Sequence, residues 1–138
     1  MTARYLLDTN IVSELARPAP NAGVLQFVAG IPEIMVSVIL FHELTFGLAT
    51  APAKQQGRLT LFIQAIRGRF GDRAIAIDVS IAETAARLRA FAKEQGRALS
   101  VADSLIAATA VVHDATLVTR NVKDFDNLSV ALFNPFSD

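Results

Sequence analysis

One short stretch, Arg4-Tyr5-Leu6-Leu7-Asp8-Thr9-Asn10, decides the fold class. It is an apolar run that stops at a carboxylate, a pattern typical of a buried strand. Thr9 and Asn10 can cap the helix that follows, which we expect to end near Pro18. Asp8 itself allows two interpretations, because an aspartate directly after a strand either caps a helix or belongs to a functional site.

The rest of the chain repeats this pattern of apolar runs separated by helical segments. The further candidate strands are residues 34–38, 74–78, 115–119 and 130–133. Continuous apolar strands that alternate with helices indicate a parallel sheet covered on both faces. The sequence therefore predicts an α/β fold, a three-layer α/β/α sandwich with a central parallel sheet of the Rossmann-like kind.

Two serines mark expected helix starts in the second half of the chain. Ser80 is followed three residues later by Glu83, which has the form of a capping box, and that helix ends at Gly96. Ser100 opens a second helix that reaches about His113.

The composition limits the possible functions. The chain has 138 residues, no cysteine, and 13 basic against 13 acidic residues, so we expect a single domain over residues 1–138. The absence of cysteine excludes thiol catalysis and thiolate metal sites. No apolar stretch approaches the roughly 20 residues of a membrane span, and no signal peptide is evident, so we expect a cytoplasmic protein without a membrane partner.

The zero net charge argues against tight charge-driven binding to bulk nucleic acid. The charge is unevenly distributed, however. Nine basic and four acidic residues lie between Lys54 and Arg97. These basic helices could follow an RNA backbone as a rim, although solvated helix faces also explain such charges.

Several polar residues stand in apolar surroundings. Glu43 lies in a helix over residues 39–50 that is apolar nearly all round, where a lone carboxylate is costly unless it is paired or binds a metal. Asp103 follows Ser100 at the spacing of a capping pair, which favours a structural role when it is taken alone. Asn121 and Asp124 each also fit a loop or helix-cap role.

The combination carries more weight than any single residue. Asp8 and Asn121 fall just past the carboxyl ends of predicted strands, where parallel sheets bind ligands. Carboxylates brought close together cannot all ionise unaided, and hard divalent cations with oxygen ligands relieve that repulsion. Two such ions can hold the attacking water and the leaving oxygen of a phosphodiester.

Four motifs follow one another along essentially the whole chain. They are Leu6-Leu7-Asp8-Thr9-Asn10, the His-Glu-Leu-x-x-Gly helix around Glu43, Ala102-Asp103 before Ile106-Ala107-Ala108-Thr109-Ala110, and Thr119-Arg120-Asn121-x-x-Asp124-Phe125. In order and spacing they resemble the PIN domain, most closely the VapC/FitB toxins of bacterial toxin–antitoxin pairs. The resemblance implies an acidic pocket that binds Mg²⁺ or Mn²⁺ and endoribonuclease activity on RNA. It also implies a homodimer and inhibition by a small cognate antitoxin that binds DNA.

Residue by residue, the resemblance gives each polar side chain an expected role. Asp8 and Asp103 match direct metal ligands, and Glu43 matches an acid that ligates the metal or orients water. Thr9 and Thr119 match hydroxyls that line the pocket.

The chain departs from the family pattern at one position. Asn121 stands where a fourth acid is often found, and it can ligate or hydrogen-bond without bringing charge. Asp124, one helical turn on, is a candidate replacement ligand. We therefore expect one tight Mg²⁺ site and a weaker one assembled with substrate.

Three other functions are compatible with parts of the pattern. A phosphoacceptor signalling module would need two adjacent acids near the first strand, and a haloacid-dehalogenase-like phosphatase would need a second aspartate after Asp8. The chain has neither. A PIN scaffold that is catalytically weak or inactive and acts by partner binding stays open because of Asn121. His42 and His113 are expected to have no catalytic role, since a two-metal hydrolase needs no histidine base.

Overall fold

The computed structural model describes residues 3–30 and 33–138, and within them four short strands form a single sheet. The sheet order is β2-β1-β3-β4, and each neighbouring pair is parallel. The strands are β1 (Tyr5–Leu7), β2 (Ile34–Met35), β3 (Thr116–Val118) and β4 (Leu132–Phe133). The predicted parallel α/β architecture is confirmed.

Six helices and two 3₁₀ turns connect these strands in the described part of the chain. They are α1 (Thr9–Leu15), α2 (Ala22–Gly30), α3 (Val38–Ala49), α4 (Ala53–Phe70), η1 (Gly71–Arg73), α5 (Val79–Glu94), α6 (Val101–Val112) and η2 (Val122–Phe125). None of the helices in residues 3–30 and 33–138 is long and apolar enough to cross a membrane.

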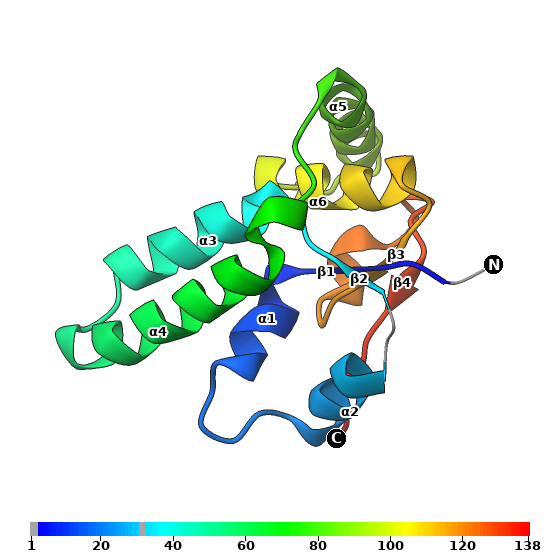
Figure 1. Cartoon of the computed structure of the whole chain (residues 1–138). Helices are drawn as coiled ribbons and strands as arrows, with labels where there is room; N and C mark the ends of the chain where they lie inside the picture. The colour runs from blue at the N-terminus through cyan, green and yellow to red at the C-terminus, as the bar shows by residue number, and fades with distance from the viewer. Residues whose placement is uncertain (1–2, 31–32) are drawn as a thin grey trace.

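The alternation of side chains along β1 and β3 creates the three layers. Leu6 and Leu117 join one core cluster, with Ala92 of α5 and Ile106 of α6. Leu7 and Val118 join a second cluster, built with α1, α2, α3 and α4. In Figure 1, α5 and α6 lie above the strands, α1 and α2 lie below them, and α3 and α4 extend to the left. Because both faces are covered, the strands carry apolar residues at successive positions.

The segment 74–78 is not the strand that we predicted from its composition. Only Ile75 pairs, in a single parallel bridge to Ser37, with Ile75 N donating to Val36 O at 2.9 Å. Ile75 O accepts from Val38 N at 3.1 Å, and the segment then leaves the sheet. Asp78 then caps α5 by accepting a hydrogen bond from Ile81 N, so the chain enters the helix after this single bridge.

Two helix caps also differ from the prediction. Asp8, and not Thr9 or Asn10, caps α1, with its carboxylate accepting from Thr9 N. Asp78 caps α5 two residues before Ser80, the residue that we expected there. Ser100 caps α6 as predicted and accepts from Asp103 N.

The C-terminal segment is fixed to the start of α2 by hydrogen bonds. Asn21 Oδ1 accepts from Ser137 N at 3.0 Å, and Asn21 Nδ2 donates to Ser137 O at 2.9 Å. Gly23 makes this close approach possible, since a Cβ atom at that position would lie 2.4 Å from Pro135 O and 2.7 Å from Ser137 N. The last residues of the chain therefore help to close the α2 side of the core.

The replacement Gly23→Ala should separate this tail from α2 and lower the free energy of unfolding by about 1–3 kcal/mol, the usual cost of overpacking. Gly57→Ala in α4 is the matched control, because a Cβ there meets nothing within 4 Å. Because Gly57→Ala removes a glycine from a helix, this variant should have a free energy of unfolding higher by about 0.5–1 kcal/mol. Urea denaturation of the wild type and both variants measures these free energies. Equal stability of the Gly23→Ala variant and the wild type would contradict the packing described here.

Candidate functional site

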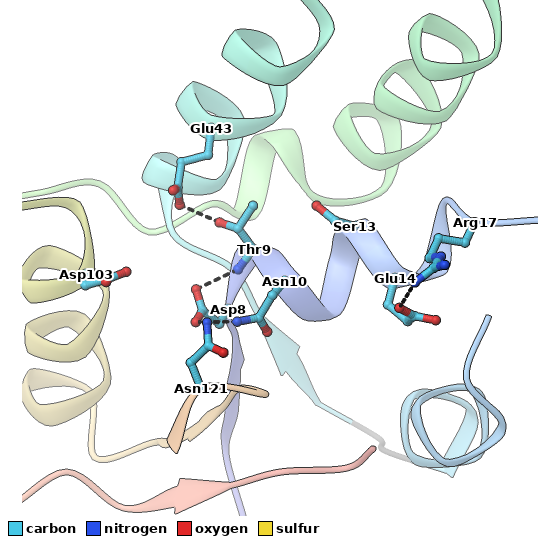
Figure 2. Close-up of a pocket in the computed structure, with 9 residues that line it drawn as sticks. All are labelled: Asp8, Thr9, Asn10, Ser13, Glu14, Arg17, Glu43, Asp103 and Asn121. Carbon is cyan, nitrogen blue, oxygen red and sulfur yellow. Dashed lines mark hydrogen bonds and ion pairs between the residues drawn. The ribbon is translucent and has the colours of Figure 1, made fainter. Parts of the chain in front are cut away.

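A polar cavity of about 580 Å³ lies at the carboxyl edge of the sheet, where β1 ends and α1 begins. Of the residues predicted for a site, Asp8, Thr9, Glu43, Asp103 and Asn121 line it. Figure 2 shows Asp8 at the centre, with Glu43 approaching from α3 and Asp103 from α6. Residues far apart in the sequence thus meet where a parallel sheet is expected to bind a ligand.

Asp8 is a buried carboxylate, with only 5% of its surface exposed. Its Oδ1 accepts from Thr9 N at 2.7 Å, and its Oδ2 accepts from Thr119 Oγ1 at 2.8 Å. Burial raises the pKa of Asp8 from 3.8 to about 6, against the hydrogen bonds from Thr119 and Thr9, which lower it. Repulsion from Asp103 and Glu43 raises the pKa further. Both interpretations of Asp8 therefore hold, because the residue caps a helix and also faces the cavity.

Glu43 reaches the cavity from the first half of α3, and a threonine holds its carboxylate. Thr9 Oγ1 donates to Glu43 Oε1 at 2.6 Å. No arginine or lysine in the described residues lies within 4.0 Å of this carboxylate, since the single ion pair recorded there joins Arg17 to Glu14. The alternative interpretation of Glu43, a partner within the fold, is met by the Thr9 hydroxyl and not by an arginine among the described residues.

Asp103 enters the cavity from the first turn of α6. Its backbone N donates to Ser100 Oγ at 3.0 Å, as the capping interpretation predicts, and its side chain is half-buried. Burial raises its pKa, the Ser100 hydrogen bond lowers it, and the charges of Glu43 and Asp124 raise it. Asp124 thus acts on the site through its charge but is not among the residues that line the cavity.

Asn10 is a site residue that sequence reasoning treated only as a possible cap. Its Nδ2 lies 3.2 Å from both Asp8 Oδ2 and Thr119 Oγ1, and its Oδ1 accepts from Arg120 N at 3.2 Å. Asn10 therefore ties α1 to the loop after β3, and the available signal was its position in the Asp8-Thr9-Asn10 motif.

Thr119 is buried and acts from behind the cavity. It contacts Asp8 but is not a lining residue, so the expectation that its hydroxyl lines the pocket is wrong. The same hydroxyl accepts a hydrogen bond from Asn121 N at 3.1 Å. Thr119 thereby fixes the position of Asn121 relative to Asp8.

Three further lining residues were not predicted and lie farther along α1 or just after it: Ser13, Glu14 and Arg17. Glu14 is buried, accepts from Asn21 N at 2.8 Å and pairs with Arg17 at 3.5 Å. Arg17 is largely exposed, so the cavity has an acidic centre and, at one end, the Glu14–Arg17 ion pair (Figure 2). One signal in the sequence could have predicted these lining residues. Helical spacing from Asn10 places Ser13 and Glu14 on the same face of α1, and Arg17 continues the spacing just after the helix. Neither histidine lines the cavity.

The residues of the acidic centre fit a divalent cation. The carboxylates of Asp8, Glu43 and Asp103 face one cavity, and no basic side chain of the described residues pairs with them. In residues 3–30 and 33–138, no three acidic or histidine side chains lie close enough together to hold one metal ion jointly. Magnesium commonly binds through one or two carboxylates and retains several waters, so a pair of these acids is sufficient.

The raised pKa of Asp8 makes stability depend on pH in metal-free protein. The unfolded chain loses the proton of Asp8 near pH 3.8 and the folded protein near pH 6. The folded state therefore binds more protons between these values, so the free energy of unfolding falls as pH rises through this window. At roughly 1.4 kcal/mol per pK unit, the loss is on the order of 3 kcal/mol.

The Asp8→Asn variant should lack this loss and be more stable than the wild type at pH 7. Denaturation at pH 4 to 8 in EDTA measures the difference, with Asp72→Asn on the exposed η1 turn as the control. Parallel pH profiles for the wild type and Asp8→Asn would contradict the assignment.

Comparisons with known proteins agree with this geometry. The VapC ribonuclease Y4jK of Sinorhizobium fredii is 34% identical over 137 residues, which cover 95% of this chain and 96% of Y4jK. The crystal structure of FitAcB from Neisseria gonorrhoeae superposes with a TM-score of 0.85 at 36% identity, covering 95% of this chain and 97% of that one. A toxin–antitoxin complex from Klebsiella pneumoniae gives a TM-score of 0.73 at 29% identity, covering 97% and 99% of the two chains.

The PIN domain family itself matches residues 5–130, from the start of β1 almost to β4. The match includes all the acidic residues that line the cavity. The chain belongs to the PIN domain family.

Proposed function

We propose that this protein is a divalent-metal-dependent endoribonuclease, with Mg²⁺ as the metal and Mn²⁺ as a substitute, that acts in the cytoplasm as the toxin of a toxin–antitoxin pair. The observation that carries the proposal is the group formed by Asp8, Glu43 and Asp103, three carboxylates that face one cavity without a basic partner among the described residues. The relative named a ribonuclease supports the reaction class.

We assign the metal to Asp8 and Asp103, and of the two roles expected for Glu43 we assign it the one that orients water beside the ion. A divalent ion bound there would neutralise the carboxylates and supply Lewis-acid activation of water and of the phosphodiester. Thr9 holds Glu43 through its hydroxyl, and Thr119 and Asn10 hold Asp8, so the acids are oriented before substrate arrives. Asn121 offers an uncharged amide at the edge of the cavity, where it can hydrogen-bond a phosphate oxygen or a metal-bound water ligand.

Replacing either proposed ligand should abolish cleavage without unfolding the protein. Asp8→Asn and Asp103→Asn should each lower the rate of cleavage of a labelled RNA more than about 100-fold, because loss of an outer-shell partner alone costs up to that much in metal sites. EDTA should stop the wild-type reaction, and Mg²⁺ or Mn²⁺ should restore it. Gel-based cleavage assays at several metal concentrations measure these effects.

Asp72→Asn, outside the cavity, serves as the charge-matched control and should cleave like the wild type. Cleavage that persists in EDTA and in both ligand variants would contradict the metal mechanism. If the wild type cuts no RNA but still binds an antitoxin, the inactive PIN scaffold is the better description, and Asn121 in place of an acid is the residue that favours it.

An apolar groove beside the cavity supports the proposed antitoxin partner. It has a volume of about 310 Å³, lies between α1, α3 and α4, and shares Ser13 and Glu43 with the acidic cavity. Its walls include Leu44 and Phe62, so an apolar segment of a partner could bind there and extend over the acids. The solved toxin–antitoxin complex of similar fold supports a partner of this class.

A bulky charge in the groove should separate inhibition from cleavage. Gly47 lines the groove, and Gly68 on α4 does not; a Cβ at either position meets nothing within 4 Å. Gly47→Arg should keep its RNA cleavage but no longer co-purify with the cognate antitoxin, whereas Gly68→Arg should still bind the antitoxin. Equal co-purification of both variants would contradict the placement of the partner.

A further inference from the structure

A second cavity, of about 680 Å³, lies at the end of α5 and is lined by basic side chains and by small or apolar residues, with no acid among them. Its charged lining residues are Arg89 and Lys93 on α5 and Arg97 on the loop to α6. The remaining lining residues are small or apolar: Ala86, Ala90, Gly96, Ala98 and Leu99. Because most of these residues are alanine or glycine, their side chains leave an open hollow beside the three cationic groups.

The positive charge of this hollow is not neutralised by the protein. No carboxylate in the described residues lies within 4.0 Å of Arg89, Lys93 or Arg97. Arg89 Nε donates to Leu99 O at 3.2 Å, and Arg97 Nη1 donates to Lys123 O at 3.4 Å. Backbone carbonyls therefore orient the two guanidinium groups while leaving their charge available to a ligand.

The turn at the end of α5 brings Arg97 to the border of the hollow. Gly96 adopts a left-handed conformation with φ of 76°, Gly96 N donates to Lys93 O, and Arg97 N donates to Ala92 O. The helix ends at this turn, and Arg97 beyond it lines the same hollow as Arg89 and Lys93.

The hydrogen bonds of Arg89 and Arg97 to backbone carbonyls contribute to the fold, but they do not account for the placement of Arg89 beside Lys93. Arg89 and Lys93 are four residues apart on one helix, a spacing at which like charges destabilise by about 0.2–0.5 kcal/mol. The helix dipole favours a cation such as Lys93 in the last turn, but its effect does not extend back to Arg89.

The basic hollow and the acidic cavity share no lining residue, but residues adjacent in the chain connect them. Leu99 of the hollow directly precedes Ser100, the cap of the helix that carries Asp103. Arg97 also donates to Asp126 O and so holds η2, which directly follows Asn121. A polymer with its scissile phosphate among the acids could therefore place another part of its backbone at the basic hollow.

We propose that the hollow formed by Arg89, Lys93 and Arg97 binds a backbone phosphate of the RNA substrate away from the scissile bond. This inference rests on the proposed function and extends it to the length of RNA that the protein recognises. Arg89 and Lys93 provide the charge, and Arg97 both contributes charge and holds η2. The contact is to the phosphodiester backbone, so it favours longer RNA without selecting a base.

The test compares two double variants that each remove two positive charges. Arg89→Gln/Lys93→Gln alters the hollow, and Arg87→Gln/Lys54→Gln alters exposed helix positions outside it. Arg97 stays unchanged because its loss would also disturb η2. Fluorescence anisotropy measures binding of a labelled 14-nucleotide RNA in EDTA over a series of salt concentrations, and cleavage of the same RNA and of a dinucleotide is measured in Mg²⁺.

The hollow variant should bind the 14-nucleotide RNA roughly 5- to 20-fold more weakly at low salt, with a salt slope shallower by about 0.7 per lost phosphate contact. Its KM for the long RNA should rise while cleavage of the dinucleotide is unchanged. The control variant should match the wild type in each measurement.

Equal RNA binding by the hollow and control variants would overturn the inference while leaving wild-type cleavage, and so the proposed function, intact. RNA binding that depends on the hollow without any cleavage in Mg²⁺ would support the inference and contradict the nuclease. Thermal unfolding with and without inorganic phosphate is a further measurement. If phosphate stabilises the wild type but not the hollow variant, and RNA binding is the same in both, the hollow is a small-anion site and the inference is overturned.

Discussion

The placement of one carboxylate, Asp8, at the junction of β1 and α1 is the constraint on which the rest of the site depends. Its burial is tolerated because Thr9, Thr119 and Asn10 supply hydrogen bonds, which offset part of the cost of removing the charge from water. Two of these donors belong to α1, and the third follows β3. The same contacts therefore start a helix, join β1 to the loop after β3 and orient an oxygen ligand towards the cavity.

The charge distribution resolves the apparent conflict between a neutral chain and the proposed nucleic-acid substrate. Equal numbers of acidic and basic residues hide a separation in space, since carboxylates meet in one cavity and basic groups border another. The acidic cavity by itself would repel RNA, and the proposed cation would remove that repulsion. A distant basic contact would then contribute to affinity where it does not compete with the metal.

Most of the fold and the acidic site could be predicted because apolar runs, helix caps and the polar residues after strands are features of neighbouring residues in the chain. Apolar runs ending in polar residues gave β1 and β3, and Ser100 and Gly96 gave the ends of α6 and α5. The expected strand over residues 74–78 failed because composition records apolarity but not pairing, and Asp78 ends the extended segment early. Thr119 was placed in the pocket from motif resemblance, although its hydroxyl is turned into the hydrogen-bond network behind it.

The sequence by itself determined the element types, the parallel sheet and the identity of the acidic residues, since periodicity, caps and strand-end carboxylates are local properties of the chain. Only the tertiary structure decided which polar groups share a cavity. Glu43, Asp103 and Asn121 meet Asp8 because parallel pairing aligns the carboxyl ends of β1 and β3 and α3 packs beside α6. It also decided that Arg17 lies at the cavity end and that Arg97 lines the same hollow as Arg89. Such proximity depends on packing between segments remote in sequence, which no local pattern encodes.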